Sequence, residues 1–334
     1  MKRLLAGAAL AAVAATLPLH DAEVTAAERL KMTMNWTADS AHLGFALAEK
    51  RGYYAKEGLE VEFEEGRGSS VAAQLVATGR TPLGYADAGA ALKVASQGAP
   101  IRIIATIWKS SQFGIQFLES SGIEKPADLK GRKLSVAPGS AMVALVPMFL
   151  KANGLDEEDV TIVSAKQEAA IGLLASGQID AIAETPENVV VPLARQGLAV
   201  GNMYFYEYGV PLVSLSLIAR EDRIAENPDL YRRFVRATLR GWRDAIEEPE
   251  AAVDALLELF PETRNSREDL LAAARYSFSS VCPGGSGDVI GYTPEETWNG
   301  IYEVMTTALD FPTTKPMSAY YTLDLLPEEP VTCP

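Results

Sequence analysis

The sequence predicts an α/β protein with two lobes, each built on a mainly parallel sheet. Short β-like runs alternate with helical runs along most of the chain, which is typical of parallel strands joined by crossover helices. The 334 residues are too many for one small core and suit two domains or one two-lobed domain. Apolar residues make up 48% and charged residues 22% of the chain, which indicates a soluble globular protein.

The first series of elements spans residues 30–108. Strict alternation of apolar and charged residues in LEVEF (59–63) predicts a half-buried strand. SSVAAQLVATG (69–79) begins with serines and ends at a glycine, as a capped helix does. By the same criteria the expected strands are 30–36, 59–63, 82–87 and 101–108, and the expected helices are 41–58, 69–79 and 88–98.

A second series lies between two parts of the first. Its expected strands are 114–119, 132–137, 160–165 and 179–184, and its expected helices are 139–154, 166–177 and 186–197. A further strand at 212–219 precedes a helical region that begins at Asn227. We therefore expect one lobe from residues 27–112 plus 212–334 and the other from residues 113–211, with hinges near 112–116 and 209–213.

The N-terminus predicts a secretory signal peptide over residues 1–26. Lys2 and Arg3 form a positive region, an apolar run follows it, and small residues up to Ala26 form a cleavage site. The apolar run is shorter than the ~20 residues that a membrane span needs, which argues against an anchor. We therefore expect an exported protein.

Charge and motifs argue against several classes of function. The formal net charge, 30 − 44 = −14, disfavours binding to nucleic acid or to anionic membrane. The chain has no G-x-S-x-G, H-E-x-x-H or Walker A motif, and past residue 26 its one histidine is His42. We therefore expect no enzyme, no cofactor and no metal site, although Asp39 and His42 leave a base with its orienting acid as an alternative.

The two cysteines, Cys282 and Cys333, favour a disulfide. An even pair in an exported protein usually pairs. The bond would tie the Pro-rich C-terminal tail to the segment around Cys282. Two free thiols remain the alternative, because a sequence does not show whether the Cα atoms come within ~7 Å.

Polar and aromatic side chains gather where the expected strands end. Ligands of open α/β sheets bind beyond the carboxyl ends of strands, and serines that begin helices leave N–H groups free for oxygen-rich ligands. Acidic side chains there suit a ligand rich in hydrogen-bond donors, such as an amine or an aminopyrimidine. Each residue alone could equally be a core or capping residue, but together they favour a pocket. The candidate ligand-binding residues are Asn35, Trp36, His42, Ser69, Ser70, Asp87, Trp108, Ser140, Glu184 and Glu187.

Five longer stretches resemble one family. They are MNWTADSAHLGFALAEKRGYYAKEGLEVEFEEG, LVATGRTPLGYAD, GIEKPADLKGRKLSVAPGS, GLLASGQIDAIAE and AENPDLYRRFVRATLRGWRDAIEEPEAA. In order, and over most of the chain, they resemble the thiamine-pyrimidine-synthase-like and nitrate/sulfonate-type solute-binding proteins. The resemblance implies a type II periplasmic-binding-protein fold with a ligand cleft between two α/β lobes. It also implies a periplasmic, monomeric solute-binding component that serves an ABC transporter permease.

The N-W-x5-H run is most similar to the branch that binds thiamine pyrimidine precursors. That branch implies that Trp36 stacks on a flat heteroaromatic ring and that Glu184 or Glu187 binds its amino group. Thr185 and Pro186 stand where the branch tends to have aromatic residues, so another solute, such as nitrate or a sulfonate, stays open. A pyrimidine synthase is disfavoured because its cysteine cluster has no counterpart in 208–219. A sensor of the same fold is a third alternative.

Overall fold

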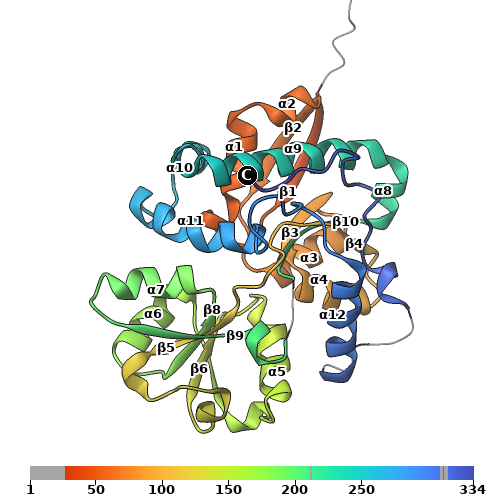
Figure 1. The fold of residues 1–334 in the computed structure, drawn as a ribbon. Coiled ribbons are helices and arrows are strands. Elements are labelled where there is room, and N and C mark those ends of the chain that lie inside the picture. Colours follow the sequence, from red (N-terminus) through yellow and green to blue (C-terminus); the bar gives the residue numbers. More distant parts are fainter. Residues whose placement is uncertain (1–26, 211–212, 309–310, 312–314) are drawn as a thin grey trace, which may run out of the picture.

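The protein is organised around two five-stranded sheets, called here sheet A and sheet B (Figure 1). The computed structural model describes residues 27–210, 213–308, 311 and 315–334. Sheet A has the strand order β2-β1-β3-β10-β4, and sheet B has the order β7-β6-β8-β5-β9. The strands of sheet A are β1 (Glu28–Thr33), β2 (Leu59–Glu64), β3 (Leu83–Asp87), β4 (Ile101–Thr106) and β10 (Leu215–Arg220). The strands of sheet B are β5 (Gly114–Leu118), β6 (Lys133–Val136), β7 (Thr161–Ser164), β8 (Ala181–Glu184) and β9 (Val200–Tyr204).

Each sheet is mixed: four of its five strands run in the same direction, as expected for a mainly parallel sheet, and one strand is reversed. In sheet A, β1 pairs parallel with β2 and β3, whereas β10 runs antiparallel to β3 and β4. In sheet B, β6 pairs parallel with β7 and β8, whereas β5 runs antiparallel to β8 and β9. Strands β5 and β10 are the ones that the chain enters from the other sheet. They arrive without a crossover helix, which is the connection that makes neighbouring strands parallel.

The chain crosses between the two sheets twice. The crossings are 107–113, between β4 and β5, and 205–214, between β9 and β10, of which 211 and 212 lie outside the described residues. All strands of sheet A fall within 27–112 or 212–334, and all strands of sheet B fall within 113–211. The exact borders of the two lobes stay a prediction. The two hinge segments also stay predictions, because they describe a movement of one lobe against the other. The expected signal peptide, 1–26, also lies outside the described residues.

Helices cover both sheets. Those around sheet A are α1 (Leu43–Lys50), α2 (Tyr53–Lys56), α3 (Ser69–Ala77), α4 (Ala88–Ser96), α8 (Glu221–Glu226), α9 (Pro228–Glu247), α10 (Pro249–Leu259), α11 (Arg267–Val281) and α12 (Glu295–Ala308). Those around sheet B are α5 (Met142–Ala152), α6 (Gln167–Ala175) and α7 (Pro186–Ala194). Within the described part of the chain, no helix combines the length and the apolar character that crossing a bilayer requires.

The long helix α9 packs across α1 (Figure 1). The contact needs a glycine, because a Cβ on Gly44 would lie 2.3 Å from the indole ring of the fully buried Trp242. The expected single helix over 41–58 is divided into a 3-10 turn (Ser40–His42), α1 and α2. The division between α1 and α2 falls at Gly52, whose φ of 64° lies in the left-handed region that ends helices.

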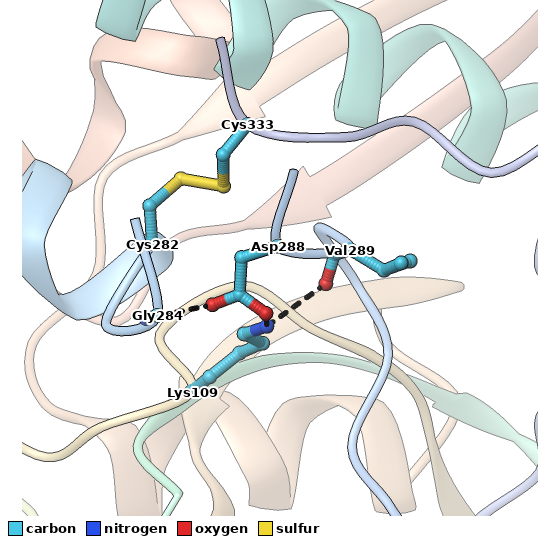
Figure 2. The surroundings of a disulfide bond; sticks show 6 residues. All are labelled: Lys109, Cys282, Gly284, Asp288, Val289 and Cys333. Atoms are coloured by element: carbon cyan, nitrogen blue, oxygen red, sulfur yellow. Dashed lines mark hydrogen bonds and ion pairs between the residues drawn. A yellow bond between two sulfur atoms is a disulfide. The ribbon is translucent and has the colours of Figure 1, made fainter. Parts of the chain in front are cut away.

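The C-terminal tail lies against sheet A and is held there by a disulfide. Cys282 at the end of α11 bonds to Cys333, with Cα atoms 6.1 Å apart. Figure 2 shows the neighbouring contacts: Lys109 forms an ion pair with Asp288, and Gly284 N–H donates to Asp288 Oδ2 at 3.0 Å. The disulfide therefore joins the tail to a loop that also contacts the crossing segment 107–113.

We expect the purified mature protein to carry this disulfide and to lose stability on reduction. The intact mass without reductant should be two hydrogen atoms below that of the reduced chain. Because the bond closes a separation of 51 residues, reduction should cost roughly 2–4 kcal/mol of unfolding free energy. A Cys282→Ser, Cys333→Ser double variant is the control, since its melting temperature should not respond to reductant. Two titratable thiols per unfolded chain, before any reduction, would contradict the expectation.

Candidate functional site

The turn that follows β1 carries two of the candidate residues, Asn35 and Trp36. Strand β1 ends at Thr33, so Asn35 and Trp36 lie in a turn past the strand rather than at its last positions. A second loop holds this turn: Gly68 N–H donates to Asn35 O at 2.7 Å, and Gly66 N–H donates to Trp36 O at 3.0 Å. A Cβ on Gly66 would lie 1.8 Å from Met34 O, so the glycine is required for this close approach.

Hydrogen bonds also join the side chains of Asp39, His42 and Asn35 to this turn and to the 3-10 turn after it. Asp39 caps the 3-10 turn Ser40–His42, and its Oδ1 accepts from Ala41 N–H at 2.8 Å. His42 is fully buried, and its Nε2 lies 2.9 Å from Asn35 Oδ1. His42 therefore lies behind Asn35 rather than at the surface of a cavity.

A small cavity lies between the two sheets at this turn. Its volume is about 40 Å³, which is room for a few water molecules. Residues near the ends of β1, β4 and β8 line it, together with the first turns of α3, α5, α6 and α7. The lining residues are Asn35, Trp36, Asp39, Ala41, Gly68, Ser69, Trp108, Phe113, Ser140, Ala141, Met142, Gln167, Glu184, Thr185, Glu187, Asn188 and Leu215.

The cavity leads into a wider groove between α11 on one side and α6 and α7 on the other. The groove has a volume of about 570 Å³ and shares Trp36, Asp39 and Glu187 with the cavity. An ion pair between Arg195 of α7 and Asp269 of α11 bridges the two sides of the groove. The cavity and the groove are therefore neighbours that share part of their lining.

Two tryptophans line the cavity from the side of sheet A. Trp36 is only partly buried and borders both the cavity and the groove. Trp108 is 1% exposed and belongs to the core as well as to the cavity wall. Its indole Nε1–H has no hydrogen-bond partner among the described residues. An unpaired buried donor that lines a cavity is free to bind a ligand acceptor.

Two glutamates line the cavity from the side of sheet B. Glu184 ends β8 and accepts from Thr185 N–H at 2.9 Å, and burial raises its pKa to about 7. Glu187, in the first turn of α7, is 6% exposed, and burial raises its pKa to about 8. Its Oε2 has no hydrogen-bond partner among the described residues. Trp108 and Glu187 thus line the same cavity, and each has a buried polar atom without a hydrogen-bond partner among the described residues.

The structure brings seven of the ten candidate residues to the cavity, and three lie elsewhere. The seven are Asn35, Trp36, Ser69, Trp108, Ser140, Glu184 and Glu187. Asp87 is turned away because its carboxylate caps α4 and accepts from Ser214 Oγ at 3.2 Å. His42 lies behind Asn35, and Ser70, the residue after Ser69 on α3, points in another direction from the helix axis.

Sequence reasoning missed several lining residues on the side of sheet B. Gln167 begins α6 just after β7, and Asn188 lies in the first turn of α7. Both follow strand ends, so the criterion that selected Glu184 could have selected them as well. Phe113 and Met142 gave no such signal, because apolar residues next to buried strands and helices usually belong to the core.

Because burial raises the pKa of Glu187 from 4.5 to about 8, its ionisation should destabilise the folded protein. The unfolded chain loses this proton near pH 4.5 while the folded protein keeps it, so stability falls as pH rises between these values. Glu187→Gln removes the penalty and should raise the unfolding free energy by roughly 1–3 kcal/mol at pH 8 and by almost nothing at pH 4.

Thermal melts of wild type and Glu187→Gln from pH 4 to pH 9 measure this difference. The matched control is Glu329→Gln, which makes the same chemical change at an exposed position. A stability gain that does not depend on pH would show that Glu187 is not buried as described.

Residues 39–252 match the model of the family described as NMT1/THI5 like. The chain belongs to this family. Over 311 residues it is 26% identical to a riboflavin-binding protein, RibY, of Chloroflexus aurantiacus, covering 89% of this chain and 86% of the relative. Over 234 residues it is 27% identical to a formylaminopyrimidine-binding protein of Halalkalibacterium halodurans, covering 70% of this chain and 71% of the relative.

One relative is named as an enzyme. Over 247 residues the chain is 24% identical to a 4-amino-5-hydroxymethyl-2-methylpyrimidine phosphate synthase of Aspergillus parasiticus, covering 70% of this chain and 71% of the relative. Among solved structures, the alkanesulfonate-binding protein SsuA of Xanthomonas axonopodis pv. citri, bound to MOPS, matches with a TM-score of 0.68 at 14% identity. The match covers 88% of this chain and 98% of SsuA. The expected periplasmic-binding-protein fold is therefore confirmed.

Proposed function

We propose that this protein is the solute-binding component of an ABC importer and that it holds a small, flat heteroaromatic solute between sheets A and B. The observation that carries the proposal is that two residues lining one cavity, Trp108 and Glu187, each have a buried polar atom, Nε1 and Oε2, without a partner among the described residues. Leaving a buried polar atom unpaired costs ~1–3 kcal/mol. A solute that accepts from Trp108 and donates to Glu187 recovers both costs.

The heteroaromatic character of the solute is supported by Trp36. Its partly exposed indole offers a large rigid face at small entropic cost. The family relatives named for binding riboflavin and formylaminopyrimidine are named for flat heteroaromatic compounds. The cavity, at about 40 Å³, is smaller than such a ring, so entry requires the two sheets to separate or Trp36 to turn.

The lining of the cavity disfavours the runner-up, a small anion or a sulfonate. Asp39, Glu184 and Glu187 line the cavity, and among the described residues neither Lys nor Arg does. An anion would therefore find no cationic side chain to pair with in the cavity. The helix N-termini that supply Ser69 and Ser140 are the one feature that favours an anion.

The enzyme alternative has weaker support. The base would be His42, but this side chain is fully buried and hydrogen-bonded to Asn35. Within the described residues, no group of His, Cys, Asp and Glu is arranged to hold a metal ion. We therefore propose binding without catalysis, in an exported, monomeric protein that delivers its solute to a membrane permease.

A thermal-shift screen tests the proposal. The panel contains aminopyrimidines, riboflavin, nitrate, aliphatic sulfonates and aromatic acids. Cyclohexylamine is the control, because it carries an amino group but no flat ring. A true solute at a hundred times its Kd should add roughly 2.7 kcal/mol to the unfolding free energy. Stabilisation by nitrate or a sulfonate, with none by any heteroaromatic compound, would overturn the proposal.

A further inference from the structure

A chain of hydrogen bonds behind the cavity wall decides which atom of Asn35 faces the cavity. Asp39 N–H donates to His42 Nδ1 at 3.2 Å, and His42 Nε2 lies 2.9 Å from Asn35 Oδ1. Asp39 is itself fixed as the cap of the 3-10 turn that carries His42. Asn35 lines the cavity, and these contacts engage its Oδ1 but not its Nδ2.

The protonation of His42 follows from the same contacts. An Nδ1 that accepts from Asp39 N–H keeps its lone pair, which places the ring proton on Nε2. With the ring proton on Nε2, His42 donates to the side chain of Asn35, and only the amide oxygen of Asn35 can accept that bond.

The amide of Asn35 therefore has one favourable orientation. Its Oδ1 faces His42. Its Nδ2 has no partner among the described residues and is free to donate to a solute in the cavity that Asn35 lines. Rotating the amide by half a turn would set Nδ2 against Nε2–H, donor against donor. The orientation is thus set by a residue that does not itself touch the cavity.

We propose that His42 is a positioning residue that holds Asn35 as a hydrogen-bond donor, so that the site selects solutes with an acceptor facing Asn35 beside a donor facing Glu187. The choice of solute rests on the proposed function, whereas the orientation of Asn35 does not. A 4-aminopyrimidine presents this pattern, with a ring-nitrogen acceptor next to an amino donor. A pyrimidin-4-one presents the reverse on the same edge, an N–H donor next to a carbonyl acceptor.

Calorimetric titration with 2-methyl-4-aminopyrimidine and 2-methylpyrimidin-4-one tests the selectivity. The wild type should prefer the aminopyrimidine by about tenfold or more, since one mismatched buried hydrogen bond is worth that much. His42→Gln keeps an N–H donor near the position of Nε2 and should retain the preference. His42→Leu removes the donor and should reduce the preference by about threefold or more, leaving the part of the preference that the contact with Glu187 supplies. An unchanged preference in His42→Leu would overturn the proposal.

Asn35→Asp supplies a check that leaves His42 in place. The carboxylate still accepts from Nε2 but has no donor for the cavity, so the aminopyrimidine should bind tens of fold more weakly. Melting temperatures of all variants are measured alongside, so that loss of folding is separated from loss of binding. Unchanged aminopyrimidine affinity in Asn35→Asp would show that Nδ2 does not contact the solute.

The state of His42 can be observed without any ligand. In ¹⁵N-histidine-labelled protein, long-range ¹H–¹⁵N spectra distinguish the two tautomers and the doubly protonated ring, and His42→Gln identifies the signals. A protonated Nε2 supports the proposal, and a ring protonated at Nδ1 alone overturns it. If neither pyrimidine binds the wild type, the proposed solute class fails, and these spectra still decide whether His42 orients Asn35.

Discussion

Replacing Trp36 by alanine is expected to weaken solute binding by tens of fold or more and to leave the melting temperature almost unchanged. Trp36 is partly exposed and borders both the cavity and the groove. Unlike the fully buried Trp242, it is not a member of the hydrophobic core around sheet A. The variant therefore loses the flat face for a ring and few core contacts.

The matched control is Trp242→Ala, which removes the same side chain from the packed contact between α9 and α1. Truncating such a core tryptophan costs ~3–5 kcal/mol of stability, and the fraction that remains folded should bind normally. Affinity and unfolding are measured for both variants with the best solute of the thermal-shift panel. If Trp36→Ala melts like Trp242→Ala and its folded fraction binds normally, Trp36 is a core residue and the site lies elsewhere.

The sequence predicted the alternation of strands and helices because apolar residues recur at a different spacing in each kind of element. LEVEF alternates every second residue and forms β2, and the serines and glycine around 69–79 bound α3. Strand direction was not readable at β5 and β10, because no local pattern records that the chain has come from the other sheet. The expectation of mainly parallel sheets therefore holds for the other strands and did not foresee the reversed direction of these two.

The sequence predicted which residues follow the ends of strands near the candidate site. It did not predict the direction in which their side chains point. Trp36, Glu184 and Glu187 were found because they follow strands, and parallel strands bring their carboxyl ends together. Asp87 satisfies the same rule, yet its carboxylate turns back to cap α4. Whether an acid after a strand caps the next helix or faces the cleft depends on the packing of that helix, which a local sequence pattern does not contain.

The sequence also did not predict the contact between the loop before α3, beside sheet A, and the loop before α5, beside sheet B. GRGSS (66–70) predicts a tight turn before a helix, and the loop does precede α3. Its second role appears only when sheet B is present. The backbone of Gly68 lies against the backbone of Gly139, in the loop before α5, so that a Cβ on Gly68 would be 1.9 Å from Gly139 O.

Replacing Gly68 by alanine is therefore expected to hold the two sheets apart and to weaken solute binding by about tenfold or more. A methyl group cannot occupy the space of a carbonyl oxygen, and both partners are backbone, so neither can turn away as a side chain would. If only a tenth of the molecules reach the closed state, the apparent affinity falls tenfold. Small-angle scattering should show that the solute contracts the wild type but not the variant.

The backbone strain of the substitution needs its own control, because Gly68 has a φ of 124°. Gly98 has a φ of 93° and no atom within 4 Å of the position of an added Cβ. Gly98→Ala thus imposes a similar strain without any steric conflict, and it should lose stability yet bind and contract like the wild type. If Gly68→Ala also binds and contracts normally, the glycine contact plays no part in closure. If it alone fails to contract, the absence of two side chains at Gly68 and Gly139 is what lets the two sheets meet around the solute.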